Sequence, residues 1–215
     1  MQPDFWHQRW FTNQIGFHEP VANPLLVKHI DNLKLRKGSR IFLPLCGKTL
    51  DIAWLASQGY QVVGAELSKL AVDQLFKELG TTPTITRQGS IDHYHVANID
   101  VLVGDIFDIT PALLGKVDAI YDRAALVALP PDMRVRYTKH LMALTNAAPQ
   151  LLICFEYDQS LVDGPPFSVT SDEVKAHYAD RYKLTSLERV PTKLKGQFEA
   201  VEVVWLLGAL DASIE

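Results

Sequence analysis

A short loop between two predicted elements carries the residues with the clearest chemical potential. Pro44-Leu45-Cys46-Gly47-Lys48-Thr49 follows an apolar run, and Glu66 lies nineteen positions after Gly47. A strand, a glycine turn and an acidic residue about twenty positions further on are typical of α/β folds that bind a ribose. We therefore predict a ligand site here, with Glu66 accepting hydrogen bonds from ribose hydroxyls. Taken alone, Glu66 fits equally well as a solvated carboxylate at a strand end.

The glycine content of this loop separates three classes of ligand. A phosphate-binding P-loop needs a glycine five positions before Gly47, where this chain has Phe42. A dinucleotide needs a second glycine so that the backbone can approach the pyrophosphate, but Gly47 stands alone. S-adenosylmethionine has a ribose and an adenine but no phosphate, so it is the ligand that the pattern favours.

A second acidic position follows another apolar run. Asp105 and Ile106 come directly after Gly104, at the end of the predicted strand 99–103. The carboxylate of Asp105 can accept a hydrogen bond from an adenine amino group while Ile106 packs on the ring. A Gly-Asp pair after a strand is also common in plain turns, so this pair supports the adenine hypothesis only together with the first loop.

The remaining reactive side chains do not indicate a second centre. Cys46 and Cys154 are interpreted as small buried thiols, and no Ser-His-Asp or Cys-His pairing occurs in the predicted loops. His93 and His95 lack a third ligand at a useful spacing, so a solvated loop is favoured over a metal site. We expect no metal.

The elements that must position these residues alternate between strand and helix. Strands are predicted over residues 40–45, 60–66, 99–103, 117–121 and 150–155, with a loop or hairpin over 84–95 and two final strands over 182–190 and 199–207. Helices are predicted from the Asn23-Pro24 cap, over 50–57, from the Ser68 cap to Gly80, over 132–144, and from a Thr170/Glu173 capping box to about 181. This order predicts a three-layer α/β fold with a mostly parallel, Rossmann-like sheet and an antiparallel C-terminal strand.

Composition limits the classes of protein that this chain can belong to. Its 215 residues, 47% hydrophobic and with net charge −4, indicate one globular domain over 1–215, with 1–22 as an N-terminal lid segment. The absence of a basic run argues against a dedicated nucleic-acid binder, and no apolar stretch reaches the ~18 residues that span a bilayer. Two cysteines and no secretory signal indicate the cytoplasm, and without a heptad pattern we expect a monomer.

Three segments of the chain resemble the thiopurine S-methyltransferase family of class I S-adenosylmethionine-dependent enzymes. They are FLPLCGKTLDIAWLASQGYQVVGAELS (42–68), DAIYDRAALVALPP (118–131) and YDQSLVDGPPFSV (157–169), and the N-terminal WHQRW is similar to bacterial members. The resemblance implies the class I methyltransferase fold and S-adenosylmethionine as cofactor. It also implies methylation of aromatic or heterocyclic thiols such as thiopurines, with selenium or tellurium compounds as further acceptors.

The resemblance also assigns roles to single residues. Arg123 matches the family arginine near the methionine end of the cofactor and the acceptor, and it is the catalytic candidate. Its structural alternative is a salt bridge to Asp122 or another carboxylate. Ala124 stands where some relatives have glycine. Cofactor contacts are implied at six positions: Trp10, Leu45, Glu66, Asp105, Ile106 and Arg123.

The chemistry requires alignment more than acid–base catalysis. The methyl group of a sulfonium is already activated, and aromatic thiols ionise near neutral pH, so no strong base is needed. Arg123 can stabilise the thiolate. The N-terminal aromatic residues and the loop 165–167 can form a lid that excludes water. Two alternatives stay open, a cofactor-binding module without catalysis and a methyltransferase for another acceptor.

Overall fold

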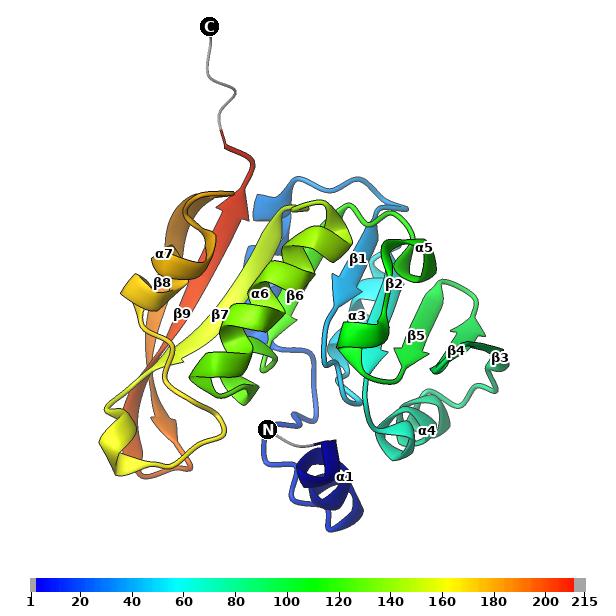
Figure 1. Ribbon diagram of the computed structural model, residues 1–215, viewed down its shortest axis with the longest axis horizontal. Helices are drawn as coiled ribbons and strands as arrows, with labels where there is room; N and C mark the ends of the chain where they lie inside the picture. The colour runs from blue at the N-terminus through cyan, green and yellow to red at the C-terminus, as the bar shows by residue number, and fades with distance from the viewer. Residues whose placement is uncertain (1–2, 211–215) are drawn as a thin grey trace, which may run out of the picture. The chain divides into compact units, whose positions relative to one another are not determined.

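The computed structural model of the chain describes residues 3–210, in two compact units divided between Ala119 and Ile120. Each unit contains its own group of strands and helices (Figure 1). The prediction of one domain over 1–215 stays a prediction, and its residues 1–2 and 211–215 lie outside the described residues.

The first unit is built on five neighbouring strands. Their order is β3 (Thr84–Gln88), β4 (Ile91–Val96), β5 (Ile99–Val103), β2 (Gln61–Glu66) and β1 (Arg40–Leu43). Strands β1, β2 and β5 run parallel, whereas β4 is antiparallel to both β3 and β5. The carboxyl ends of the parallel strands therefore lie at the same end of the sheet. The antiparallel β3–β4 hairpin extends the sheet beyond β5.

Burial explains why the central strands read as unbroken apolar runs. The side chains of Ile41, Phe42, Val62 and Val63 are fully buried, as expected for parallel strands covered on both faces. Helix α4 (Lys69–Glu78) contacts β2 and β5, and α3 (Asp51–Ser57) contacts β2. Every residue of β3 is exposed, in agreement with its place at the outside of the sheet.

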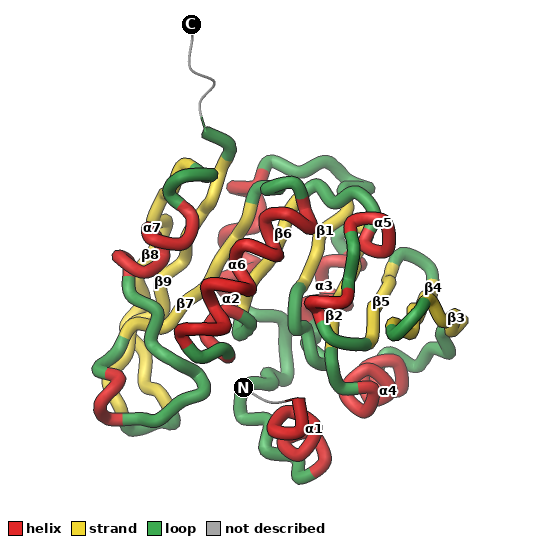
Figure 2. Tube along the Cα trace, viewed as in Figure 1, coloured by secondary structure: helices red, strands yellow, loops and turns green. Residues whose placement is uncertain are grey.

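The helices of the first unit begin where the sequence provides caps. The side chain of Asn23 accepts hydrogen bonds from the backbone of Leu25 and Leu26 at the start of α2 (Pro24–His29), and Ser68 caps α4 in the same way. The preceding helix α1 (Pro3–Phe11) lies against α4 (Figure 2). The short helices η1 (Ile30–Leu33), η2 (Ile106–Asp108) and α5 (Pro111–Leu114) complete the unit.

The second unit combines a parallel pair with an antiparallel hairpin. Strand β7 (Gln150–Glu156) pairs in parallel with β6 (Ala119–Arg123) and antiparallel with β9 (Phe198–Gly208), which pairs with β8 (Lys183–Leu194). Helix α6 (Pro131–Thr145) is fastened to β6 by a buried hydrogen bond from Tyr137 to Asp122. Its other helices are η3 (Leu126–Ala128), η4 (Gln159–Leu161) and α7 (Ser171–Tyr178).

The predicted fold class is confirmed, with parallel central strands and a C-terminal antiparallel hairpin. The first strand ends at Leu43 rather than 45, because Leu45 has a φ of 48° that a strand cannot continue through. The strand predicted over 117–121 lies at Ala119–Arg123, so Arg123 closes the strand instead of following it. Residues 84–95 belong to a hairpin.

The capping box predicted at α7 is half formed. The hydroxyl of Thr170 accepts a hydrogen bond from the backbone of Glu173 at 3.2 Å. The carboxylate of Glu173 does not return this bond to the cap but pairs with Arg134 of α6 at 2.7 Å. Tertiary pairing with a buried guanidinium therefore replaces the local bond that the sequence pattern predicts.

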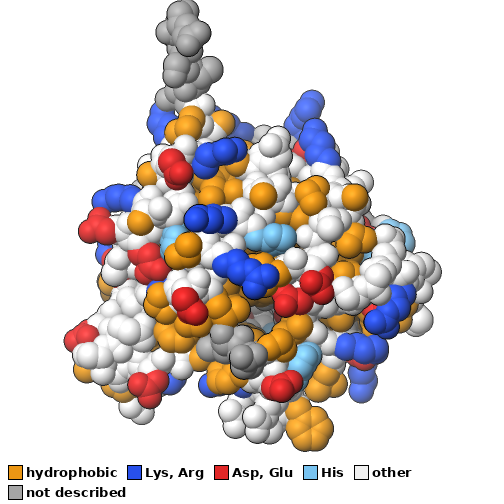
Figure 3. Space-filling view, viewed as in Figure 1, with side chains coloured by type: hydrophobic (Ala, Val, Ile, Leu, Met, Phe, Trp, Pro, Cys, Tyr) orange, Lys and Arg blue, Asp and Glu red, His pale blue; other side chains and the backbone are white. Residues whose placement is uncertain are grey.

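Surface character agrees with the composition of the chain. Acidic and basic side chains are interspersed over the visible face (Figure 3). Among residues 3–210, no helix has both the length and the apolar character needed to cross a bilayer.

Candidate functional site

The loops that leave β1 and β2 are joined by backbone and carboxylate hydrogen bonds. The amide of Cys46 donates to the carbonyl of Ala65 at 2.9 Å. Glu66 then bridges the two loops, since its carboxylate accepts from the amide of Gly47 at 2.8 Å and from the amide of Ser68 at 2.7 Å. The residue predicted to hold a ribose thus also fixes the shape of the cofactor loop.

Glu66 is 6% exposed, which excludes the alternative of a solvated strand-end carboxylate. Burial raises the pKa of its carboxyl group, and the backbone amides of Ser68 and Gly47 oppose that rise. A carboxylate has about four acceptor positions, and the amides of Ser68, Gly47 and Leu67 do not fill all of them. Glu66 therefore retains acceptor positions for hydroxyl donors.

Trp10 and Gly47 are in close contact. A Cβ atom at Gly47 would lie 2.9 Å from Cζ2 of Trp10, and the φ of Gly47 is +54°. Trp10 is 3% exposed, and its ring packs edge-on against Phe17 with centroids 5.6 Å apart. The N-terminal segment is thus seated on the cofactor loop, and the loop has a glycine at the point where the indole approaches.

Cys46 holds the same loop against β2. Its thiol is buried, and burial raises its pKa well above the usual value. A Cβ atom at Gly64 would lie 2.6 Å from Sγ of Cys46, so the strand needs glycine at this position. Cys154 on β7 is also buried with a raised pKa. Both thiols are the small buried groups that the sequence predicts.

Lys48 shows why this loop does not act as half a P-loop. Its ammonium group pairs with Glu78 at the end of α4 at 2.6 Å, and the side chain is 11% exposed. The amine that would reach a phosphate in a P-loop is therefore held in an ion pair on another helix.

Sequence reasoning missed an open groove of about 470 Å³, whose lining includes the residues that directly follow Glu66 in the sequence. Its lining comes from two helices that are far apart in the sequence: His7, Gln8 and Phe11 of α1, and residues 67–70 at the start of α4. The sequence marks Ser68 only as a helix cap. The signal that could have found the groove is the position of 67–70 directly after the acidic residue.

The second predicted pair lies at the same edge of the sheet. The amide of Gly104 donates to the carbonyl of Glu66 at 2.9 Å, which brings the ends of β5 and β2 together. The exposed Asp105 uses one carboxylate oxygen to cap η2, accepting from the amide of Phe107 at 2.9 Å. Ile106 is 5% exposed. Asp105 therefore has the turn role, with its second oxygen left over for a ligand.

In the second unit, the neighbours of Arg123 are unusual for a strand end. Arg123 is half-buried, and Ala124 has a φ of 61°. Asp122 is fully buried and accepts from Oη of Tyr137 at 2.7 Å and from the amide of Leu126 at 3.1 Å. Burial raises the pKa of Asp122 to about 6, although the hydrogen bond from Tyr137 opposes the rise. These donors disfavour Asp122 as the salt-bridge partner of Arg123, and the alternative of a salt bridge to another carboxylate stays open.

The loop 157–169 is fastened within the second unit. The amide of Phe167 donates to the carbonyl of Val127 at 2.6 Å, and Oη of Tyr157 donates to the carbonyl of Pro166 at 2.6 Å. The guanidinium of Arg134 lies 5.9 Å from the centre of the Phe167 ring. These contacts hold the Pro165-Pro166-Phe167 segment in place against Val127, Tyr157 and Arg134, and we call this segment the Pro-Pro-Phe wall.

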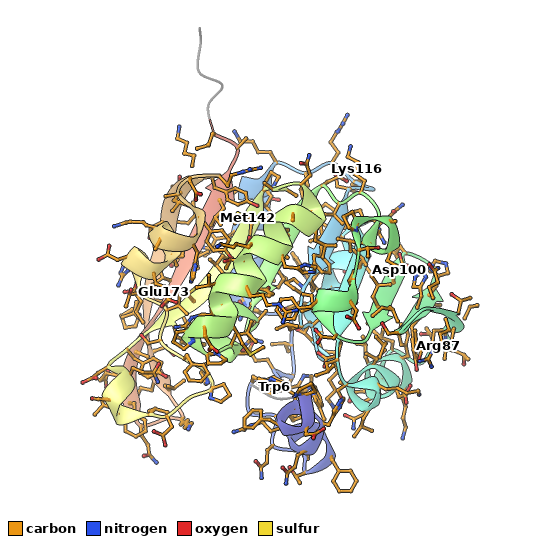
Figure 4. The ribbon with its side chains drawn as sticks, viewed as in Figure 1. Trp6, Arg87, Asp100, Lys116, Met142 and Glu173 are labelled. Atoms are coloured by element: carbon orange, nitrogen blue, oxygen red, sulfur yellow. The ribbon has the colours of Figure 1, made fainter. Side chains whose placement is uncertain are left out.

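His93 and His95 do not lie in the solvated loop that the sequence predicts. Both are on β4, and both contact the same oxygen of Asp100 on β5, at 2.7 Å and 2.8 Å. Burial alone would raise the pKa of Asp100, but hydrogen bonds from His93, His95 and Arg40 hold it below its usual value. Strand pairing thus supplies the third group that sequence spacing did not reveal. In Figure 4, the label of Asp100 marks this contact on β5, away from the labelled Trp6 of α1.

Comparisons with known proteins agree over nearly the whole chain. The model of the thiopurine S-methyltransferase (TPMT) family matches residues 1–210. The thiopurine S-methyltransferase of Xanthobacter autotrophicus is 57% identical over 210 residues, covering 96% of this chain and 99% of that protein. The enzyme of the same name from Teredinibacter turnerae is 50% identical over 209 residues, covering 96% and 97%.

Solved structures show the same fold at low sequence identity. A methyltransferase from Anabaena variabilis, described as S-adenosylmethionine-dependent, has a TM-score of 0.64 at 17% identity, covering 97% of this chain and 95% of that one. A Burkholderia thailandensis N1-methyltransferase, solved with 1,6-didemethyltoxoflavin and S-adenosylhomocysteine, also scores 0.64, at 13% identity and with 96% and 87% coverage.

Proposed function

The chain belongs to the thiopurine S-methyltransferase family, and from this premise we propose that it methylates the sulfur of aromatic or heterocyclic thiols, thiopurines among them. Family and fold make S-adenosylmethionine the cofactor. The observation that carries the proposal is the match to the family over residues 1–210. The acceptor and the roles of single residues are our inference.

The residues present fit this cofactor. Glu66 is a buried carboxylate with acceptor positions beyond those used by Gly47 and Ser68, and the residues that follow it line an open groove. A ribose would be held by Glu66, with Leu45 and Trp10 contacting the cofactor from the loop and from α1. Asp105 and Ile106 would lie on the adenine side. The bound cofactor supplies a methyl group that its sulfonium has already activated.

Arg123 is the residue that we assign to the acceptor. An aromatic thiol reacts as its thiolate, and a permanently charged guanidinium can hold that anion and lower the pKa of the thiol. No general base is needed, because the thiolate forms near neutral pH. Burial raises the pKa of both cysteines well above the usual value, which agrees with a mechanism without a protein nucleophile.

Selenols and tellurium compounds extend the same proposal. These acceptors are softer and ionise more readily than thiols, so alignment by the site is enough for reaction. The wall formed by Pro166 and Phe167 suits a planar acceptor, because its hydrogen bonds to Tyr157 and Val127 hold it in one position.

The test is incubation of the full chain with methyl-labelled S-adenosylmethionine and a panel of thiols, selenols, amines and phenols. We expect label in S-methyl products of heterocyclic thiols, with little transfer to amines or phenols. The Glu66→Ala variant serves as the matched control, because it should lose transfer to every acceptor. Cofactor binding without product from any acceptor would instead indicate a binding module, and preferred transfer to nitrogen or oxygen would indicate another acceptor class.

A further inference from the structure

A cluster of two imidazoles and one carboxylate lies at the outer part of the first unit. Nε2 of His93 lies 2.7 Å from Oδ1 of Asp100, and Nδ1 of His95 lies 2.8 Å from the same oxygen. All three ligand atoms fall within 4.8 Å of one another. Two residues apart on β4, the histidines point to one face, and β5 supplies Asp100 opposite His95. Strand pairing thus makes three potential ligands converge.

We propose that His93, His95 and Asp100 bind a borderline divalent transition-metal ion such as Zn²⁺, with water in the remaining coordination positions. Imidazole nitrogens and a carboxylate oxygen are the ligands that Zn²⁺ accepts in three-residue protein sites. Tetrahedral Zn²⁺ with bonds of about 2.0–2.2 Å needs donor atoms about 3.3 Å apart. Each histidine would therefore move about half an ångström from the oxygen that it now contacts.

The exposure of the three side chains and the contact of Asp100 with Arg40 are compatible with such a metal site. His93, His95 and Asp100 have side chains that are 29%, 53% and 19% exposed, so an ion has access from solvent. Arg40 at the start of β1 donates to the other oxygen of Asp100 at 3.3 Å, which turns Oδ1 toward the histidines. Its positive charge also weakens cation binding, so we place the site in the class of moderate affinity.

The site is separate from the cofactor loops. Asp100 is the second residue of β5 and Arg40 the first of β1, whereas Glu66 and Asp105 lie at the carboxyl ends of β2 and β5. Because these strands are parallel, the histidine–aspartate cluster lies toward their amino ends and the cofactor loops lie at their carboxyl ends. An ion would tie β4 to β5, so we assign it a structural role in holding the β3–β4 hairpin.

The experiment is a calorimetric titration of the full, untagged chain with Zn²⁺ alone in a non-chelating buffer. We expect one ion per chain, with affinity at least about tenfold weaker in His93→Gln, His95→Gln and Asp100→Asn. His140→Gln, a change on α6 outside the cluster, should leave binding unaltered. Melting curves without metal show which variants fold, and the exposed His95 makes its variant the safest of the three.

Cobalt(II) spectra separate this site from binding to cysteine. The site should give weak visible bands of nitrogen and oxygen ligation without the intense near-ultraviolet band of a thiolate, and His95→Gln should remove them. Absence of saturable binding at millimolar Zn²⁺ would overturn the proposal. Stoichiometric binding that persists in a folded His93→Gln/His95→Gln double variant would do the same.

Discussion

Single residues of the site carry two functions at once, and Glu66 is the clearest case. Its carboxylate orders the loops at Gly47 and Ser68 and, in our proposal, holds the ribose. We expect Glu66→Ala to weaken S-adenosylmethionine binding by about 1–3 kcal/mol, because hydroxyls lose a charged acceptor. Calorimetry measures the dissociation constant. Glu78→Gln, which removes a carboxylate from the nearby Lys48 pair, should have little effect. An unchanged constant in Glu66→Ala would leave Glu66 a loop-ordering residue only.

Arg123 gives a prediction about rate rather than stability. If its guanidinium stabilises the acceptor thiolate, Arg123→Ala should lower turnover about a hundredfold, the ~3 kcal/mol typical of one such electrostatic contact. Arg123→Lys should recover part of the rate, because charge returns without the planar fork. Acceptors that are already ionised should lose less. Turnover at saturating cofactor is measured across pH and paired with thermal melts. Near-normal turnover in Arg123→Ala, or a collapse of its melting temperature, would return the residue to a structural role.

The buried Asp122 predicts a pH dependence of stability. The pKa of the Asp122 carboxyl group rises from its ordinary value of 3.8, which applies to the unfolded chain, to about 6 in the folded protein. The stability that protonated Asp122 contributes is fully present below about pH 4 and is lost as pH rises through about 6. Two pKa units correspond to roughly 3 kcal/mol of unfolding free energy.

The measurement is denaturant unfolding of the wild type and of Asp122→Asn between about pH 4 and about pH 7. The variant cannot ionise, so the wild type should lose stability relative to it as pH rises. The comparison cancels the carboxyl groups whose pKa values are lowered, Asp100 and Glu156 among them. A difference that stays constant over this range would contradict the linkage.

At the scale of elements, α1 and the loop after β1 behave as a fitted pair. In Gly47→Ala, the new methyl group would meet Trp10 at 2.9 Å with φ at +54°. We expect this variant to displace α1 and to weaken cofactor binding. Gly80→Ala is the matched control, since it has φ +65° with open space around it and has only the backbone cost of about 1 kcal/mol.

Deletion of residues 1–17 extends the same test. We expect a folded core with impaired cofactor binding and turnover, because the deletion removes Trp10 together with the groove residues of α1. Melting curves and labelled methyl transfer measure the two properties. Full activity in the deletion would remove the lid hypothesis and the role of Trp10 together.

Local sequence signals predicted the bounds of helices and strands well where residues within or next to the element determine those bounds. Asn23, Ser68 and Thr170 cap the helices that they were expected to cap, and the strand over 99–103 has the predicted bounds. Signals failed where distant residues decide. The carboxylate of Glu173 pairs with Arg134 instead of completing the predicted capping box. His93 and His95 contact Asp100 only because β4 pairs with β5.

The candidate site divides in the same way. The spacing along the chain pointed to Glu66 and the loop at Gly47, which the structure brings into contact, and the ribose role of Glu66 stays a prediction. The groove was missed because its two walls come from helices that are distant in sequence. The hydrogen bond from Tyr137 to Asp122 was missed because Tyr137 reaches it from another element. Contacts of this kind depend on packing, which no local pattern records.

At the scale of the whole molecule, ligand binding is expected to appear as thermal stability. A ligand that binds only the folded chain at a hundred times its dissociation constant contributes about 2.7 kcal/mol. For a chain of this size, each kcal/mol raises the melting temperature by about 2–4 °C. We therefore expect S-adenosylmethionine to raise it by about 5–10 °C.

ATP-Mg²⁺ and NAD should produce no such shift, for reasons visible in the loop. Gly47 has no companion glycine to admit a pyrophosphate, and Lys48 is held by Glu78. Differential scanning fluorimetry with the three ligands at equal concentration measures the shifts, and Glu66→Ala should reduce the shift with S-adenosylmethionine at that concentration. A shift with ATP-Mg²⁺ and none with S-adenosylmethionine would overturn the assignment of the loop, because only a phosphate site could produce that order.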